Sequence, residues 1–285
     1  MDRSEFRFFD RMRVRWVEVD MQKIVFNGHY LMYFDNAISG YWRALALPYA
    51  GAMEYLEGDL FVRKATVEYM ASARCNDPLD VGMRCSRIGN SSLVFTAGVF
   101  RGDALLVSGE LVYVFADVPS QRPRPVPQQL RDVLQAFEAG KPMLDTRVGT
   151  WDELGRDAQA IRTEVFVNEQ RIPAEMEWDA ADASCHHAVA YNRFGMALGT
   201  GRLLEHVPGV AKIGRMAVTQ TMRGSAVGRA VLHALMDTAR ERGDREVLLH
   251  AQLSAAPFYA RCGFVERGER FDEAGIAHVE MVRPL

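Results

Sequence analysis

The chain has 285 residues, of which 48% are hydrophobic and 25% are charged, the usual balance of a globular protein. This length suits two domains of about 140 residues each better than one compact domain. The formal net charge of −3 gives no bulk attraction to nucleic acid or to an anionic membrane, so we expect neither as a partner.

The amino-terminal segment and the cysteines predict a cytoplasmic protein. Residues 1–16 alternate charged and aromatic side chains and lack the apolar stretch of a signal peptide. The sequence has no run of about 18 apolar residues, so we expect no membrane span. The four cysteines have neither metal-ligand nor Cys-x-x-Cys spacing, so we expect free thiols and no metal site.

The first half predicts one buried helix and a long antiparallel sheet. Residues 12–19 alternate apolar and charged side chains, as a half-buried strand does. Residues 28–47 form a helical pattern that is apolar nearly all round, which is typical of a buried helix. Strand-like runs follow at 60–71, 79–88, 92–101 and 104–116. This arrangement is of the α+β class.

A proline-rich stretch separates the halves. Residues 119–127 contain four prolines and cannot form a regular helix or a central strand. A short amphipathic pattern at 130–137 is then broken by Gly140 and Pro142. We therefore expect one domain over residues 1–143 and a second over residues 144–285.

The second half predicts a mixed α/β domain, in which a strand runs through a glycine-containing loop into a helix. Helices are expected at 154–168, 226–242 and 254–261, and strands at 185–204 (a pair), 211–218, 246–251 and 263–282.

A first chemical site is predicted where the buried helix begins. Asp20 follows the first expected strand, and Asn27 is a good N-cap for the helix seven residues later. The first helix amides have no intrahelical partner, and with the helix dipole they suit an oxygen that becomes negative. A carboxylate beside them can attack a thioester or activate water, although Asp20 can also serve only to cap a turn.

The order of residues from Asp20 to Tyr30 resembles the hotdog-fold thioesterases of the 4-hydroxybenzoyl-CoA thioesterase-like family, and the resemblance covers roughly residues 8–138. It implies Asp20 as the catalytic carboxylate, an amide near Asn27 as oxyanion donor, and acyl-CoA bound between the subunits of a homodimer or homotetramer. Lys23 stands where the family usually has glycine. His29 either polarises the water or packs at the helix start.

A second site is predicted where the strand 211–218 leads into a loop with small residues at 224–226 and 228, which lets the backbone approach a ligand. Arg223 and Arg229 add positive charge, so this loop suits a pyrophosphate. The expected binding residues of this loop are Arg223, Gly224, Ser225, Ala226, Val227, Gly228 and Arg229.

With the downstream segment 255–264, this loop resembles the GNAT superfamily of N-acetyltransferases, and the resemblance spans nearly all of residues 150–285, including the segment 273–278. Arg223-Gly-Ser-Ala226-Val-Gly228 matches the acetyl-CoA motif, with Ala226 in place of its first glycine. The resemblance implies that Met216, Ala217 and Val218 line the acetyl and pantetheine arm through backbone bonds. It also implies that Tyr259 returns a proton to the leaving CoA thiolate, and that Phe166 and Gln170 flank the acceptor amine.

The base that deprotonates this amine stays open. The candidates are Glu169, Glu177, His187, His250 and His278. The acidic run 175–179 is either a solvated loop or a hint of a cationic acceptor.

The sequence thus predicts a bifunctional enzyme without a permanently bound cofactor. Its first domain would hydrolyse an acyl-CoA, and its second would transfer acetyl from acetyl-CoA to an unidentified amine. The alternative is that one domain is inactive and serves as a CoA-binding regulatory or oligomerisation module.

Overall fold

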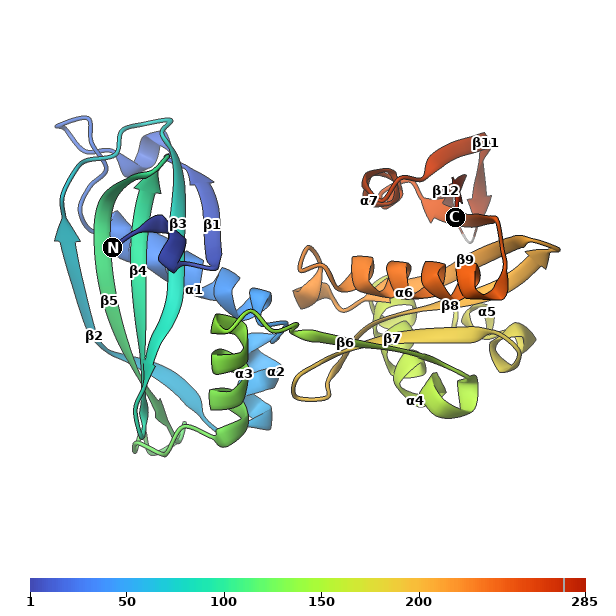
Figure 1. Cartoon of the computed structure of the whole chain (residues 1–285), viewed down its shortest axis with the longest axis horizontal. Helices are drawn as coiled ribbons and strands as arrows, with labels where there is room; N and C mark the ends of the chain where they lie inside the picture. The colour runs from blue at the N-terminus through green and yellow to red at the C-terminus, as the bar shows by residue number, and fades with distance from the viewer. Residues whose placement is uncertain (274) are drawn as a thin grey trace. The chain divides into compact units, whose positions relative to one another are not determined.

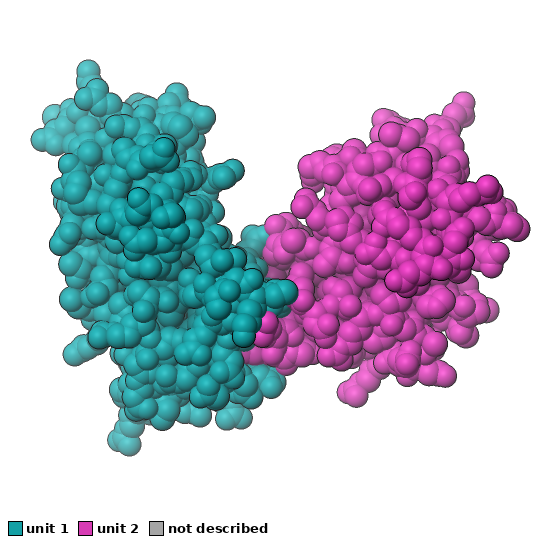
Figure 2. Space-filling view, in the orientation of Figure 1, with its two compact units in different colours: residues 1–143 teal, residues 144–285 magenta. Residues whose placement is uncertain are grey.

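The computed structural model of the chain (Figure 1) describes residues 1–273 and 275–285. Residue 274, which belongs to the expected transferase segment 273–278, lies outside the described residues. The chain divides into two compact units, Met1–Met143 and Leu144–Leu285 (Figure 2). No helix in the described part of the chain is long and apolar enough to cross a membrane.

The first unit is a hotdog-like α+β domain built on an antiparallel sheet of strand order β1-β3-β4-β5-β2. Its strands are β1 (Phe8–Arg13), β2 (Asp59–Tyr69), β3 (Pro78–Ile88), β4 (Ser92–Arg101) and β5 (Ala104–Ala116). Its helices are α1 (His29–Ala44), α2 (Tyr49–Tyr55) and α3 (Gln128–Glu138). The four predicted strand-like runs are confirmed to within two residues as β2 to β5.

Helix α1 is buried against this sheet, as its nearly all-round apolar pattern predicted. Phe34 and Tyr41 are fully enclosed, and Tyr33 is 1% exposed. Strand β5 comes so close to the helix that a Cβ added at Gly109 would lie 2.4 Å from the Phe34 ring. Glycine at 109 therefore lets the helix and the sheet meet.

Two predictions in this unit are wrong. Residues 12–19 are not one strand, because β1 ends at Arg13 and residues 16–18 form a short 3-10 turn. The Glu18 side chain accepts a hydrogen bond from the Arg15 amide (2.7 Å) and so closes that turn locally. The predicted helix 28–47 stops at Ala44, and Ala46 has a left-handed backbone (φ 56°) that a helix cannot contain.

The second unit is a GNAT-like mixed domain with a seven-stranded sheet of order β11-β12-β10-β9-β8-β7-β6. Its strands are β6 (Leu144–Gly149), β7 (His186–Asn192), β8 (Ala197–Val207), β9 (Val210–Val218), β10 (Glu246–Gln252), β11 (Val265–Glu273) and β12 (Ile276–Pro284). Its helices are α4 (Trp151–Arg162), which continues as a π-helical segment (Thr163–Glu169), α5 (Ala174–Glu177), α6 (Val227–Arg242) and α7 (Ala256–Arg261). Strand β6 was not predicted.

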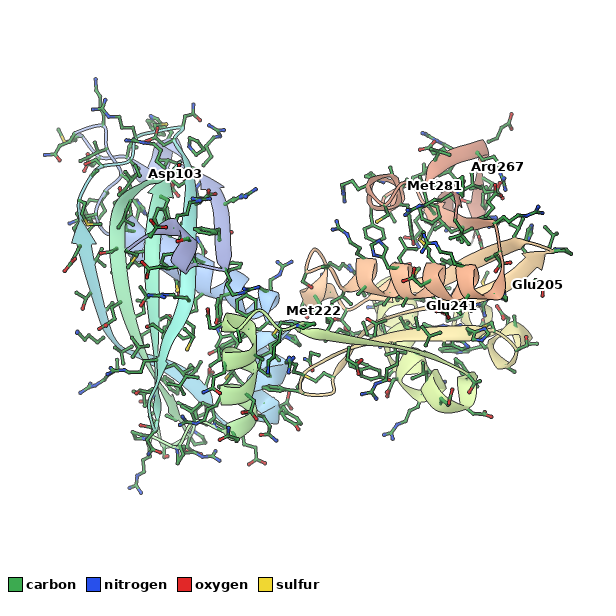
Figure 3. All side chains as sticks on the ribbon, viewed as in Figure 1. Asp103, Glu205, Met222, Glu241, Arg267 and Met281 are labelled. Atoms are coloured by element: carbon green, nitrogen blue, oxygen red, sulfur yellow. The ribbon has the colours of Figure 1, made fainter. Side chains whose placement is uncertain are left out.

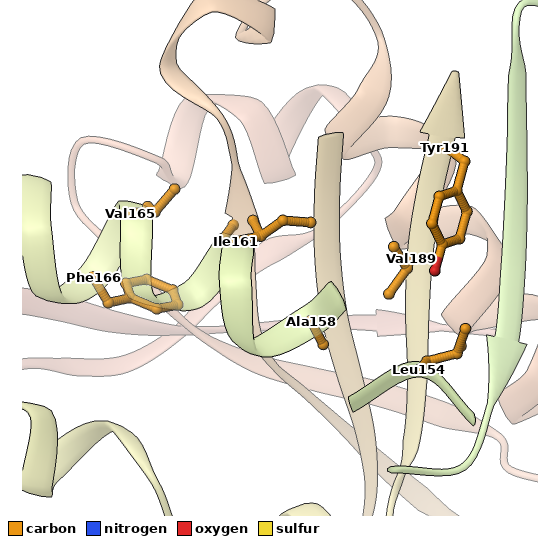
Figure 4. Close-up of a cluster of buried hydrophobic side chains, with 8 residues drawn as sticks. Leu154, Ala158, Ile161, Val165, Phe166, Val189 and Tyr191 are labelled. Atoms are coloured by element: carbon orange, nitrogen blue, oxygen red, sulfur yellow. The ribbon is translucent and has the colours of Figure 1, made fainter. Parts of the chain in front are cut away.

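Helices cover both faces of this sheet (Figure 1). On one face, Leu154, Ala158 and Ile161 of α4 form a buried cluster with Val189 and other side chains (Figure 4). On the other face, α6 packs over glycines of β8, where Cβ atoms would meet side chains of α6 at 2.6–3.1 Å. Only the pairing of β9 with β10 is parallel, and this exception positions the site described below.

We predict that Gly109→Ala lowers the free energy of unfolding by about 1–3 kcal/mol, because the new methyl group overpacks the contact with Phe34. Denaturant unfolding of the whole chain measures the change. Gly51→Ala is the control, because its added methyl group lies in α2 at an ordinary 4.0 Å from Pro48. Equal stability of the two variants would contradict the prediction.

Candidate active sites

The loop that carries Asp20 is a closed turn. Val19 and Val25 form a single antiparallel bridge at its base, and the Asp20 amide donates to the Ile24 carbonyl at 2.9 Å. The Asp20 carboxylate accepts a hydrogen bond from the Gln22 amide at 2.8 Å. The expectation that Asp20 directly ends a regular strand is therefore wrong, although the bridge holds the loop in place.

Asp20 lines a cavity of about 350 Å³ next to the start of α1. Asn27, Phe26 and Tyr30 form part of the wall, and residues 69–72 after β2 form another part. The Tyr69 hydroxyl donates to the Asn27 carbonyl at 3.2 Å and joins these two parts. The structure thus brings Asp20 and Asn27 to one cavity with partly aromatic walls.

The start of α1 differs from the prediction in detail. Gly28, rather than Asn27, is the N-cap residue, and it makes no side-chain cap. Among the described residues, the Asn27 and Gly28 amides donate to no protein group, and of these two residues Asn27 lines the cavity and Gly28 does not. His29 does not line the cavity, and its ring packs edge-on against Phe26.

The second site lies where two parallel strands separate. Strands β9 and β10 pair from Val210 and Glu246 as far as Ile213 and Leu249, where the register ends. On its other side β9 is bulged, so that Arg215 and Met216 have no register partner on β8. Backbone groups of β9 are thereby left available at this point, as binding of a pantetheine arm requires.

A cavity of about 420 Å³ opens at this separation. Met216 and Tyr259 line it, together with Phe166 from the π-helical segment and Gln170, which directly follows that segment. Of the other predicted strand residues, Ala217 is buried under α4 and Val218 does not line the cavity. Burial raises the pKa of the Tyr259 phenol, which keeps it protonated as a general acid must be.

The loop after β9 leads to the start of α6; Figure 3 labels Met222, in the 3-10 turn before this helix, and Glu241, in its last turn. Gly224 and Ala226 have left-handed backbones, with φ of 81° and 69°. The first amides of the helix, those of Val227, Gly228 and Arg229, have no intrahelical partner, and the ladder begins with the Ala230 amide, which donates to the Ala226 carbonyl. The predicted loop Arg223–Arg229 is thus a turn that ends in unpaired donors, as a phosphate site requires.

Arg223 has an additional partner that the sequence did not reveal. Its guanidinium forms a two-point ion pair with Glu169, at 2.5 and 2.7 Å, and its Nε donates to the Val218 carbonyl. The bond from Arg223 holds the pKa of the Glu169 carboxyl below its usual range. Arg229, in the first turn of α6, is exposed. The positive charge of the loop is therefore partly neutralised at Arg223.

The acidic run 175–179 is neither a solvated loop nor a free negative cluster. Glu177 is 2% exposed and accepts a bond from the buried Arg162 at 2.6 Å. Asp179 forms a two-point pair with Arg202 at 2.6 and 2.7 Å. Asp182 joins the same network and binds both arginines. The negative charges of two carboxylates in this run are therefore balanced by arginine side chains.

The structure also separates the five candidate bases. Glu169 and Glu177 are held by arginines, and His187 does not line the cavity and contacts the Asp182 carbonyl instead. Only His250 and His278 line the cavity without such an ion pair to arginine.

These two histidines differ in their hydrogen bonds. The Lys212 ammonium lies 3.5 Å from His250 Nδ1, and burial together with that charge lowers the pKa of His250. His278 Nδ1 lies 2.7 Å from the Ile276 carbonyl and can only donate to it, which leaves Nε2 with the lone pair. The His278 ring stacks on Phe271 and is 8% exposed. His278 thus has a fixed tautomer with a basic nitrogen.

One buried group of potential metal ligands exists among the described residues, formed by Asp182, Cys185 and His187. Arg162 and Arg202 already occupy the Asp182 carboxylate. Burial raises the pKa of the Cys185 thiol to about 11, so it stays protonated at neutral pH. This chemistry fits a hydrogen-bonded cluster and disfavours a cation.

Two known families match separate segments of the chain. Residues 152–285 match the acetyltransferase (GNAT) domain, and residues 22–108 match the thioesterase superfamily, which leaves Asp20 two residues before that match. The uncharacterized N-acetyltransferase YjcF of Bacillus subtilis is 35% identical over 133 residues, which are 46% of this chain and 94% of that protein.

Solved structures resemble each unit. An acyl-CoA N-acyltransferase from Pseudomonas aeruginosa is 33% identical, with a TM-score of 0.44, and the match covers 49% of this chain and 99% of that one. Slr0204, a 1,4-dihydroxy-2-naphthoyl-CoA thioesterase from Synechocystis, is 16% identical, with a TM-score of 0.43. The match covers 46% of this chain and 97% of that one.

We predict that Ala226→Gly stabilises the chain by about 0.5–1 kcal/mol. Its left-handed backbone strains alanine by about 1–2 kcal/mol, which exceeds the extra unfolded-state entropy of glycine. Ala230→Gly, one turn into α6, is the matched control and should destabilise by about 1 kcal/mol. Thermal unfolding of the whole chain measures both, and destabilisation by Ala226→Gly would refute the strain argument.

Proposed function

Because the chain belongs, through residues 152–285, to the GNAT acetyltransferase family, we propose that it is a bifunctional enzyme that acts on CoA thioesters. The second unit transfers acetyl from acetyl-CoA to an amine, and the first unit hydrolyses an acyl-CoA. Neither reaction needs a permanently bound cofactor. The four cysteines are free thiols, which supports a reducing cytoplasm as the compartment.

The observation that supports hydrolysis is that Asp20 shares one cavity with Asn27, whose amide donates to no protein group. This amide stabilises the thioester oxygen as it becomes negative. Asp20 either takes a proton from the attacking water or attacks the carbonyl itself, in which case water then hydrolyses the acyl-Asp20 anhydride. In both routes the thioester C–S bond breaks, one water is consumed, and the products are a carboxylic acid and free CoA thiol.

We place a homodimer or homotetramer contact on the first unit. Strand β2 is an edge strand of its sheet, and edge strands pair readily with another chain. Apolar side chains near the Asp20 cavity are exposed, among them Trp16 (82%), Met21 (101%) and Phe26 (52%). A second copy that covers them would also complete the cavity wall.

For acetyl transfer, the separation of β9 from β10 holds the thioester beside the phosphate loop. His278 Nε2 takes the proton of the ammonium, and the free amine attacks the acetyl carbonyl. Tyr259 returns a proton to the CoA thiolate as the C–S bond breaks. The acceptor meets a wall on which the charges of Glu177 and Asp179 are compensated.

The first test is free-thiol release from acyl-CoAs of increasing chain length, without added amine. We expect Asp20→Asn to lower the rate by about 100-fold or more, because general acid–base groups contribute about 10²–10⁴-fold. Asp103→Asn, an exposed carboxylate in a turn, is the control and should match the unchanged chain. Equal rates for Asp20→Asn and the control would refute the assignment.

The second test uses the Asp20→Asn chain, so that hydrolysis does not consume acetyl-CoA. Amine-dependent CoA release is followed with spermidine, L-lysine, glucosamine and tyramine as probes. We expect His278→Gln to lower kcat/KM by about 100-fold and to remove the rise of rate with pH, since that rise reports the base. Tyr259→Phe should lower kcat and leave that rise in place. An unchanged pH profile in His278→Gln would exclude it as the base.

A further inference from the structure

A buried carboxylate lies two residues before Asp20. Glu18 is 1% exposed, and its two carboxylate oxygens accept four hydrogen bonds. Oε2 accepts from the Arg15 amide (2.7 Å) and from the Tyr33 hydroxyl (2.9 Å). Oε1 accepts from Arg15 Nε (2.8 Å) and Nη2 (2.6 Å).

These bonds keep Glu18 ionised. Burial by itself raises the pKa of the Glu18 carboxyl, but the bonds from Arg15 and Tyr33 outweigh it and leave the pKa lowered. Glu18 does not line the cavity, so it does not touch a substrate there. Its charge is therefore held for a structural purpose within the protein.

Glu18 lies at the base of the Asp20 loop, where the backbone of the loop closes on itself. The Glu18 carbonyl accepts a hydrogen bond from the Phe26 amide at 3.0 Å, and the Val19–Val25 bridge follows directly. The chain therefore leaves this point to form the Asp20 loop and returns to it. Through Tyr33, which belongs to α1, the Glu18 carboxylate ties the base of that loop to the helix that begins beside the same cavity.

We propose that Glu18 and Tyr33 are positioning residues, which fix the Asp20 carboxylate relative to the oxyanion amides at the start of α1. The inference rests on the proposed hydrolysis at Asp20. A displacement of about 1 Å between reacting groups lowers a rate by about 100-fold. Loss of this tie therefore lowers turnover, while residues that bind the substrate stay in place.

The same helix supplies a matched control. Tyr41 is also a fully buried tyrosine of α1, and its hydroxyl also donates to a carboxylate, that of Glu138 on α3. Tyr33→Phe and Tyr41→Phe each remove one buried hydroxyl-to-carboxylate bond from opposite ends of one helix. Only the first of these bonds leads to the Asp20 loop.

The experiment measures thiol release from the preferred acyl-CoA, together with the melting temperature, for the whole chain and both variants. We expect Tyr33→Phe to lower kcat by about 10-fold with KM unchanged, and Tyr41→Phe to lose similar thermal stability with kcat unchanged. Equal effects of the two variants on kcat would overturn the proposal, because a general loss of stability would then explain both.

A double-mutant cycle separates this inference from the proposed function. In the Asp20→Asn chain, Tyr33→Phe should lower the residual rate less than about twofold, since the group that it positions is absent. A full 10-fold loss there would show that Tyr33 acts independently of Asp20 and would overturn the inference. A rate that Asp20→Asn leaves unchanged would instead refute the proposed function, and the inference with it.

Discussion

An α-helix cannot satisfy its own first amides, and each of the two predicted sites includes such a helix start. At the first, Asn27 lines the Asp20 cavity and its amide donates to no protein group, and at the second the amides of Val227 to Arg229 follow the loop after β9. Each helix is packed along its length against a sheet, so its unpaired end is fixed in position. Packing therefore determines where a developing oxyanion or a phosphate can bind, and the side chains around each end add the chemistry.

Before each of these two helix starts, one residue with a left-handed backbone stands where the motif that it resembles has glycine. Lys23 (φ 61°) and Ala226 (φ 69°) each adopt the left-handed conformation, and each replaces a glycine of the motif that it resembles. The chain thus retains a glycine-like backbone without glycine and bears a local strain for it. Strain of this kind persists only where the surroundings hold it. The closed hydrogen bonds of the Asp20 loop and the start of α6 are such surroundings.

Local patterns predicted the elements well, because strands β2 to β5 are runs of strand-forming residues that turn residues separate, and α1 is apolar nearly all round. The failures are contacts that no local pattern reveals. Residues 12–19 alternate as a strand does, but Glu18 binds Arg15 and Tyr33 and forms a turn. Arg223 pairs with Glu169, which is 54 residues away in the sequence. Asp20, Asn27 and Tyr259 were predicted from motifs and line the two cavities, whereas His29 does not.

The buried ion network next to the second cavity bears on its chemistry. Its three guanidinium groups (Arg162, Arg202, Arg215) meet three carboxylates (Glu177, Asp179, Asp182), so this wall carries no net charge. Burying such a network gains little stability by itself, but it fixes the wall rigidly. Its members at the cavity stay partly open to solvent, because the side chains of Asp179 and Arg215 are 39% and 25% exposed. An ammonium at this wall therefore meets no uncompensated carboxylate, and its proton has to be taken by another group. The proposed base, His278, lines the same cavity, and its bond to the Ile276 carbonyl leaves Nε2 with the lone pair.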